Sequence, residues 1–515
     1  MDPQRTARDW LAIAQAQLSG GDLGAAQATL TQALSAHPGA PDLQRARAGV
    51  LQQTGRLAEA ESLLRGLLDA DPGDAASAFP LARMLKQQGR MAAAASAIRA
   101  CFAGGANDRD ADLAISAIEL LDDCDRKADA AAIAATAIDA NPDDARLHAY
   151  AGMLQIQLGE FQQARGHYLF ALEHDARAWE WHVPIGLASV QRYQDSEHSD
   201  FALLRNGLKL DGLSDKARAE LHFALGKAYD DLGDHEQAAR YFGQGNAIAH
   251  RATRWSRKAW RRAIEARLAA RPITGALDPA ADFTPVFVVG MPRSGTTLLA
   301  GLLSRHPAVC NRGELPWIAN LAERPALADK PDLASLQDAA AAYAAQSRQD
   351  DAGCVRWFID KQPLNFRYVD LMLSMFPQAR IIHCQRNERD TALSLWMQCF
   401  REEVQGYSYD FGDIAAVMRD CNRLMTHWRQ RFPAAIHSVR YEQLVRDPQG
   451  ITDALADWIG LPRETAAIAA APPEPLSSIS TASLWQARQP VNTSSVGRWR
   501  HYAPLVPALS RFRDD

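Results

Sequence analysis

The sequence has few cysteines, and they form none of the patterns in which cysteine usually carries structure or chemistry. Its seven cysteines are scattered over 515 residues, and none forms a pair with the spacing CxxC. An odd number of isolated cysteines excludes a disulfide framework and a zinc ribbon. This usage is typical of a protein that works in a reducing compartment.

Long apolar runs and a surplus of positive charge are also missing. No stretch approaches the roughly 20 apolar residues that a bilayer-spanning helix needs, and the first residues lack the basic and apolar regions of a secretory signal. The net charge of -5 gives no indication of a nucleic-acid or anionic-membrane partner. We therefore predict a cytoplasmic protein without membrane insertion, and its length predicts two or more globular domains.

The first half of the chain contains an internal repeat of 34 residues. Gly21, Gly55 and Gly89 are 34 residues apart, as are Pro38 and Pro72, and the surrounding text recurs as GDLGAAQATLTQAL, TGRLAEAESLLRGLL and QGRMAAAASAIRACF. Each unit reads as a helix, a tight turn and a second helix. The period and the small residues at the turn resemble the tetratricopeptide repeat family.

The resemblance covers roughly residues 7–250, with a poorly matching unit at 191–213. It implies an all-α solenoid over 1–250 of about six to seven helical hairpins, whose groove recruits or orients an acceptor substrate or a protein partner. A basic amphipathic helix at 254–271 follows, within a linker predicted over 251–280. We interpret this helix as a solvated connection rather than a membrane-binding segment, because its apolar face is thin.

Residues 281–515 follow a different pattern, in which short apolar strands alternate with helices. Strands are predicted at 286–290, 380–385 and 436–440, with helices following at 296–305, 388–400 and 448–459. Continuous β-branched runs favour a parallel sheet that is covered on both faces. The predicted fold is thus an all-α solenoid followed by a P-loop-like α/β domain, with ligands beyond the carboxyl ends of the strands.

The segment VFVVGMPRSGTT at 286–297 looks like a phosphate-binding loop without its lysine. Gly290 and Gly295 have the GxxxxG spacing of such a loop, but Thr296 occupies the lysine position. The amides of the loop and the start of a helix can still hold an anion. Without the lysine that reaches a terminal phosphate, ATP chemistry is less favoured, and Arg293 offers a cation inside the loop instead.

The second half resembles the sulfotransferases that use 3′-phosphoadenosine 5′-phosphosulfate (PAPS), in particular the tyrosylprotein branch and bacterial enzymes that carry tetratricopeptide repeats. The residues that carry the resemblance are PRSGTT (292–297), RGE (312–314), DK (360–361), QRNERDTALS (385–394), RYEQLV (440–445) and SLWQARQPVNTSSVGRW (483–499). The resemblance implies a PAPS-dependent sulfotransferase that releases adenosine 3′,5′-bisphosphate and needs no metal.

Several residues are implied to bind the donor. In the family, an arginine and a serine at the positions of Arg386 and Ser394 grip the 3′-phosphate, as charge-assisted donors to a dianion. Tyr441 matches a nucleotide-contacting tyrosine, and Arg498 matches a lysine that contacts the same phosphate. The implied donor-binding residues of the loop are Arg293, Ser294, Gly295, Thr296 and Thr297.

The implied catalytic group consists of Glu314, Lys361, Ser483 and Arg293. Glu314 matches the base that takes the proton of the acceptor hydroxyl, while Lys361, Ser483 and Arg293 match residues near the sulfonate and the bridging oxygen. Transfer would be in line and without a covalent enzyme intermediate.

Two histidines are alternative bases, because other branches of the family use histidine. Structural roles are favoured for both, since His306 ends a predicted helix before a proline and His383 lies in a predicted strand.

Departures from the tyrosylprotein branch leave the acceptor open. Leu315, Pro316 and Trp317 follow Glu314 where that branch reads acidic peptides, and Gln398 and Leu484 replace donor contacts. Protein tyrosine, a glycan, a lipid-linked sugar and a small phenol are all candidate acceptors. A P-loop nucleotide kinase or hydrolase and a non-catalytic repeat scaffold are the alternative functions, and the sequence predicts no oligomeric state.

Overall fold

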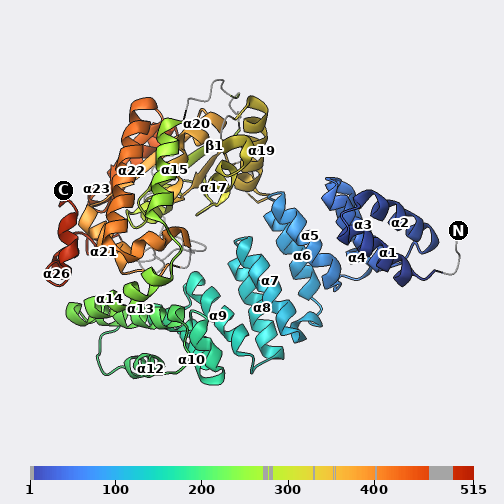
Figure 1. The fold of residues 1–515 in the computed structure, drawn as a ribbon, viewed down its shortest axis with the longest axis horizontal. Coiled ribbons are helices and arrows are strands. Elements are labelled where there is room, and N and C mark those ends of the chain that lie inside the picture. Colours follow the sequence, from blue (N-terminus) through green and yellow to red (C-terminus); the bar gives the residue numbers. More distant parts are fainter. Residues whose placement is uncertain are drawn as a thin grey trace. The chain divides into compact units, whose positions relative to one another are not determined.

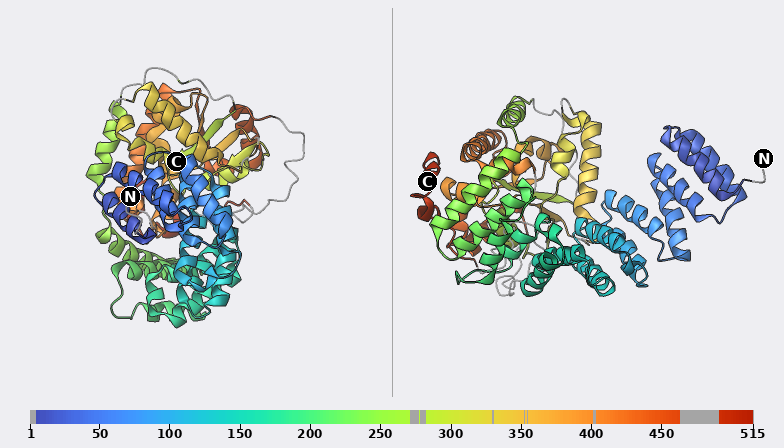
Figure 2. Two further views of the ribbon diagram at one scale, coloured as in Figure 1. Left: turned by 90° about the vertical axis from the view of Figure 1, so that its right-hand side faces the viewer. Right: turned by 60° about the horizontal axis from the view of Figure 1, so that its bottom comes forward.

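The computed structural model describes residues 5–270, 277, 282–328, 331–351, 353, 355–400, 403–462 and 491–514. The chain divides into two compact units, one of Met1–Tyr150 with Gln349–Asp351 and one of Ala151–Arg348 with Ala352–Asp515. In Figures 1 and 2 the helical repeats run from blue to green, and the strands lie in the yellow and orange part of the chain. The division of the chain at residues 250 and 280 stays a prediction.

The first unit is built of helical hairpins, as the 34-residue period predicts. Its paired helices are α1 (Ala7–Ser19) with α2 (Leu23–Ala36), α3 (Pro41–Gln53) with α4 (Leu57–Ala70), α5 (Ala75–Gln87) with α6 (Met91–Phe102), and α7 (Ala111–Asp123) with α8 (Lys127–Ala140). Gly21, Gly55 and Gly89 lie in the tight turns after the first helices of their hairpins, and their φ angles are between 77° and 79°. At Gly21 and Gly55 a Cβ would meet nothing within 4 Å, so the left-handed backbone alone is the reason for glycine there.

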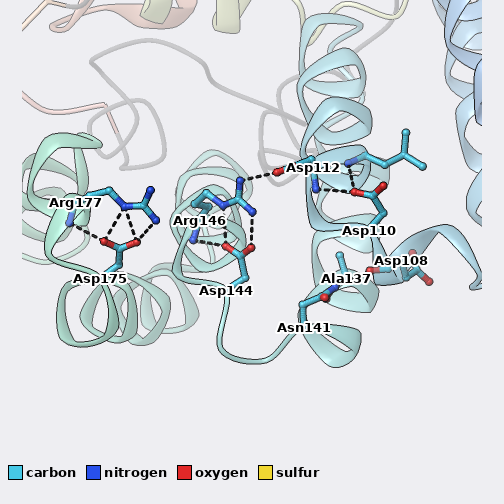
Figure 3. A network of polar contacts seen from close by, with 10 residues as sticks. Asp108, Asp110, Asp112, Ala137, Asn141, Asp144, Arg146, Asp175 and Arg177 are labelled. Carbon is cyan, nitrogen blue, oxygen red and sulfur yellow. Dashed lines mark hydrogen bonds and ion pairs between the residues drawn. The ribbon is translucent and has the colours of Figure 1, made fainter.

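Aspartates fix the starts of several helices in the loops between hairpins (Figure 3). Asp110 accepts from the amides of Asp112 and Leu113 at 3.1 and 3.0 Å and caps α7. In the first unit, Arg146 pairs with Asp144 at 2.7 Å and with Asp112 at 2.6 Å. The same Asp-x-Arg arrangement recurs in the second unit, where Asp175 accepts from the Arg177 side chain at 2.7 Å.

The second unit continues the helices and then forms the sheet domain. Its first helices are α9 (Ala145–Leu158), which begins in the first unit, α10 (Phe161–His174), α11 (Val183–Ser189), α12 (Ser199–Gly207), α13 (Asp215–Asp231), α14 (His235–Ala252) and α15 (Arg257–Ala269). The poor repeat match at 191–213 corresponds to the short helix α12 and the irregular segment before it. Among the described residues, no helix has the length and apolar character needed to cross a bilayer.

The sheet has five parallel strands and confirms the predicted fold class. They are β1 (Thr284–Gly290), β2 (Val309–Asn311), β3 (Trp357–Asp360), β4 (Arg380–Gln385) and β5 (Ile436–Arg440), in the order β2-β3-β1-β4-β5. The chain leaves central β1 toward β2 and β3 and returns to β4 on its other side. This reversal opens a crevice at the carboxyl ends of β1 and its neighbours.

Helices cover both faces of this sheet. They are α16 (Thr296–Leu303), α17 (Trp317–Ala322), α18 (Pro325–Ala328), α19 (Leu333–Arg348), α20 (Val369–Met375), α21 (Glu388–Trp396), α22 (Phe411–Arg431), α23 (Tyr441–Leu444), α24 (Pro448–Ile459) and α26 (Trp499–Tyr502). On one face, α16 and α24 bury Val286, Val288 and Ile382 in an apolar core. A rigid core of this kind holds the loops at the strand ends in place.

The predicted linker helix is exposed along most of its length, as expected of a solvated connection, but it also packs on the sheet domain. Helix α15 packs on α22, where the buried Trp260 donates its indole N–H to Asp420 at 3.1 Å, and Arg267 forms an ion pair with Asp370. The preceding helix α14 also contacts the sheet domain, because Asn246 donates to the carbonyl of Trp396 at 2.8 Å. The last repeat helices, α15 and the sheet domain therefore share one compact unit.

Candidate active site

The loop between β1 and α16 has the shape that its glycines predict. Gly290 has φ 146°, and a Cβ there would lie 2.4 Å from the carbonyl oxygen of Cys384. Gly295 has φ 96°, and its Cβ would lie 2.5 Å from the ring of Tyr441. Both positions therefore require glycine. Helix α16 begins at Thr296, so the amides at its start face the end of the crevice as an anion site would need.

Two arginines and a serine meet beside this loop. The Arg293 side chain donates from Nε to Ser394 Oγ at 3.0 Å, and Arg386 donates from Nη1 to the Arg293 carbonyl at 2.9 Å. Arg386 also lies over the ring of Tyr441, 4.8 Å from its centre. Four residues predicted from distant segments are thus brought together by the ends of β1, β4 and β5.

The electrostatics of this cluster favour an anion. Burial lowers the pKa of Arg293 to about 10, and the positive charges of Arg386 and Arg498 act in the same direction. In the described structure, Arg386 Nε and Ser294 Oγ are buried without a hydrogen-bond partner. Buried donors of this kind are costly unless a ligand satisfies them. The residues present therefore fit a phosphate group between the loop and the guanidinium groups.

Arg498 lies near this cluster but is paired with a residue outside the sheet domain. It forms an ion pair with Asp230 of α13, and Tyr502 donates its hydroxyl to the same carboxylate at 2.6 Å. Burial acts to lower the pKa of Arg498, but Asp230 outweighs it and the pKa is raised. Arg498 is therefore a firmly held cation.

Glu314 and Lys361 form an ion pair at the end of β3. The amide of Lys361 donates to the Gly313 carbonyl at 2.8 Å, which continues the pairing of β2 with β3 and places the two side chains together. The Lys361 side chain is buried, while that of Glu314 is 31% exposed. Parallel strands are about 4.8 Å apart, so the ends of β3 and β4 lie about 10 Å apart, on either side of the β1 loop.

Residues 285–465 match the family model described as the sulfotransferase family. Residues 17–85 and 219–248 match models of the tetratricopeptide repeat. The chain therefore joins tetratricopeptide repeats to a sulfotransferase domain.

Three relatives illustrate the range of similar proteins. An uncharacterised protein of Aquifex aeolicus is 33% identical over 44% of this chain and 32% of its own length. The nodulation protein NoeE of Sinorhizobium fredii is 36% identical over 21% of this chain and 30% of its own. Protein-tyrosine sulfotransferase 1 of Danio rerio is 25% identical over 45% of this chain and 73% of its own. The chain thus spans about a third of the length of the first two.

Among solved structures, the sulfotransferase domain of the Synechococcus PCC 7002 olefin synthase is 21% identical to this chain. The alignment covers 44% of this chain and 91% of that domain, with a TM-score of 0.32.

The two candidate histidines of the sulfotransferase domain are buried, whereas the side chain of Glu314 is partly exposed. His306 has backbone partners at both ring nitrogens, the Pro462 carbonyl at 3.0 Å and the Ala308 amide at 3.1 Å. His383 is buried in β4, and burial together with Arg429 lowers its pKa to about 3. A histidine this hard to protonate is a poor proton acceptor, which favours the structural role predicted for His383, while the backbone partners at both ring nitrogens favour the one predicted for His306. Ser483 and Leu484 lie outside the described residues.

Three further residues shape the candidate site, and the sequence assigned no role to them. Asp390 accepts from the amides of Gly497 and Trp499 at 2.6 and 2.9 Å, Asp230 pairs with Arg498, and Asp360 is buried next to Lys361 in the chain. Asp390 lies inside the motif QRNERD, but the N-cap of α21 is Asn387, and nothing in the motif indicates that Asp390 binds a segment more than 100 residues away. Asp230 had no signal, because its partner is 268 residues away. The described residues include no cluster of three or more potential metal ligands.

Asp360 makes the stability of the sulfotransferase domain depend on pH. Burial raises its pKa to about 7, despite the hydrogen bond from the Tyr343 hydroxyl at 2.9 Å. A raised pKa means that stability is lost as the pH rises from about 4 to about 7. Asp360→Asn should therefore become more stable than the wild type over this range, by up to about 4 kcal/mol. Urea unfolding of both proteins at pH 4.5, 6 and 8 measures the effect, and parallel stability curves would contradict it.

Proposed function

We propose that the chain is a sulfotransferase that moves the sulfonate group of PAPS to an acceptor hydroxyl. The observation that carries this proposal is the convergence of Arg293, Arg386 and Ser394 on a phosphate-binding loop without lysine, with two buried donors lacking a partner. Guanidinium groups and amides suit a phosphate and a phosphosulfate, and they need no metal to do so. The family match of residues 285–465 supports the same conclusion.

The donor binds with its 5′ end in the loop and its 3′-phosphate at the strand end of β4. The amides from Ser294 to Thr297 surround the 5′-phosphosulfate, and Gly295 keeps the loop open beneath Tyr441. Arg386, Ser394 and Arg498 hold the 3′-phosphate. The Nε–H of Arg386 has no partner in the described structure and can donate to the phosphate without breaking a hydrogen bond. The bonds from its other nitrogens to the Arg293 and Ser495 carbonyls orient the guanidinium before the ligand arrives.

PAPS supplies an activated sulfonate, whose leaving group is adenosine 3′,5′-bisphosphate. Glu314 accepts the proton of the acceptor hydroxyl as its oxygen attacks the sulfur. Lys361 and Arg293 donate to the bridging oxygen, where negative charge develops as the S–O bond breaks. The ion pair of Lys361 with Glu314 must open in this step, since Lys361 turns to the donor and leaves the carboxylate to the acceptor. The family resemblance assigns a role near the sulfonate to Ser483 as well, which lies outside the described residues.

The proposal assigns the acceptor only by its chemical class, which is a hydroxyl of protein tyrosine, a glycan or a small phenol. Trp317 begins α17 three residues after Glu314 and is half-buried, so it offers an aromatic surface to a ring beside the base. The tetratricopeptide repeats recruit or orient the acceptor or a partner, because stacked hairpins present a groove that suits a peptide or a domain.

Binding of two nucleotides to the full chain tests the proposal. We expect tight binding of adenosine 3′,5′-bisphosphate in titration calorimetry, no binding of ATP with magnesium, and transfer of label from PAPS to a hydroxyl acceptor in an acceptor screen. Tight binding of ATP with magnesium and release of phosphate would instead indicate a kinase or hydrolase. A folded chain that binds neither nucleotide would indicate a repeat scaffold.

A further inference from the structure

Helix α13 of the repeat region contributes a carboxylate to the surroundings of the proposed donor site. Asp230 lies in the last turn of α13 and is largely buried, with 11% of its side chain exposed. One of its oxygens pairs with Arg498 Nη2, and the other accepts from the Tyr502 hydroxyl at 2.6 Å. Both partners belong to the C-terminal segment, more than 260 residues further along the chain. We propose that Asp230 is a positioning residue, which holds Arg498 toward the 3′-phosphate of the donor.

This inference rests on the proposed function and adds a residue of the repeats to it. The segment that carries Arg498 is held on its other side by the sheet domain. Arg386 donates to the Ser495 carbonyl at 2.6 Å, and Asp390 accepts from the amides of Gly497 and Trp499. Residues 495–502 thus lie between α21 and α13, with Arg498 next to the arginines that receive the phosphate.

The charges explain why a carboxylate is needed at this point. Burial lowers the pKa of Arg293 and of Arg386, and the charge of Arg498 acts in the same direction on both, so the three cations repel one another before the ligand binds. Asp230 offsets the third charge and keeps Arg498 near the other two. In the described structure the ion pair engages Nη2, which leaves the N–H groups on Nη1 and Nε for an anion.

A second contact of the repeats supports the same end of the site. Trp396 ends α21 two residues after Ser394, and it packs against Phe242 of α14 with 5.9 Å between the ring centres. Asn246 of α14 caps the same turn through the Trp396 carbonyl. The last repeat hairpin is therefore a structural part of the proposed 3′-phosphate site, besides any role in recruiting the acceptor.

Asp230→Asn tests the proposal in the full chain, because asparagine keeps the size of the side chain and removes its charge. We expect binding of adenosine 3′,5′-bisphosphate, measured by titration calorimetry, to weaken by about tenfold. The matched control is Asp234→Asn, four residues further on, since Asp234 caps α14 through the Gln237 amide. This control should bind with the affinity of the wild type.

A double-mutant cycle with Arg498→Gln separates positioning from a general loss of structure. If Asp230 acts through Arg498, Asp230→Asn has no further effect on affinity in the Arg498→Gln background. Additive losses, an unchanged affinity of Asp230→Asn, or tighter binding because the carboxylate competes with the ligand would each overturn the inference. Failure of the wild type to bind adenosine 3′,5′-bisphosphate would instead overturn the proposed function, and this inference with it.

Discussion

Replacing Glu314 with glutamine is expected to lower the rate of sulfonate transfer by about a thousandfold, because the acceptor hydroxyl would lose its general base. Glutamine has nearly the same shape but cannot take up the proton. The proposed donor contacts are made by the β1 loop and the arginines, so the affinity for adenosine 3′,5′-bisphosphate should stay within about twofold of the wild type. Initial rates with radiolabelled PAPS and titration calorimetry measure the two quantities separately.

The ion pair with Lys361 makes the choice of control important for this variant. Loss of Glu314 leaves the buried Lys361 without its partner, which can affect stability. A thermal unfolding curve of the Glu314→Gln protein therefore accompanies the rates. Glu323→Gln is the matched control, since Glu323 is exposed at the end of α17 and should keep full activity. Glu314→Gln with near-normal turnover would remove Glu314 as the base.

Replacing Arg386 with glutamine is expected to weaken binding of adenosine 3′,5′-bisphosphate by about a hundredfold. A charge-assisted hydrogen bond contributes about 1.5–3 kcal/mol, and Arg386 also orients the β1 loop through the Arg293 carbonyl at 2.9 Å. In rate measurements we expect a raised KM for PAPS, because donor binding is lost in the ground state as well as in the transition state. Titration calorimetry on the full chain measures the affinity directly.

A control arginine distinguishes this effect from a general change in charge. Arg305 is exposed just beyond the end of α16, so Arg305→Gln removes one positive charge at a distance from the donor. Its affinity should equal that of the wild type. An equal loss of affinity in both variants would mean that Arg386 contributes only to the overall electrostatic field of the protein. The proposed 3′-phosphate site would then be wrong.

Local patterns predicted three of the described strands and three of the described helices of the sulfotransferase domain. The strands at 286–290, 380–385 and 436–440 are β1, β4 and β5, because continuous β-branched runs suit buried parallel strands. Strand β2 was missed, since its three residues Val309–Asn311 are too short for a pattern. The tight turns of the repeats were equally local, because they need a left-handed residue at one position.

The extent of the linker was not predictable in the same way. The sequence pattern at 254–271 predicts a helix with a narrow apolar face, and only Trp260 and Ile264 of α15 are buried. Its attachment to α22 is mainly polar, through Arg257 to Asp413 and Trp260 to Asp420. A charged side chain that pairs with a distant carboxylate looks the same in a sequence as one that faces water.

The sequence by itself determined the strands and helices with a marked local pattern, the glycines of the β1 loop and the resemblance of the chain to known families, because each depends on residues that are neighbours in the chain. Only the tertiary structure decided which charges meet. It brought Arg293 and Arg386 together across 93 residues and paired Arg498 with Asp230 across 268. Such pairs form where packed strands and helices end beside one another, and no periodicity marks them in advance. The inclusion of the last repeat hairpin in the proposed donor site is of this second kind.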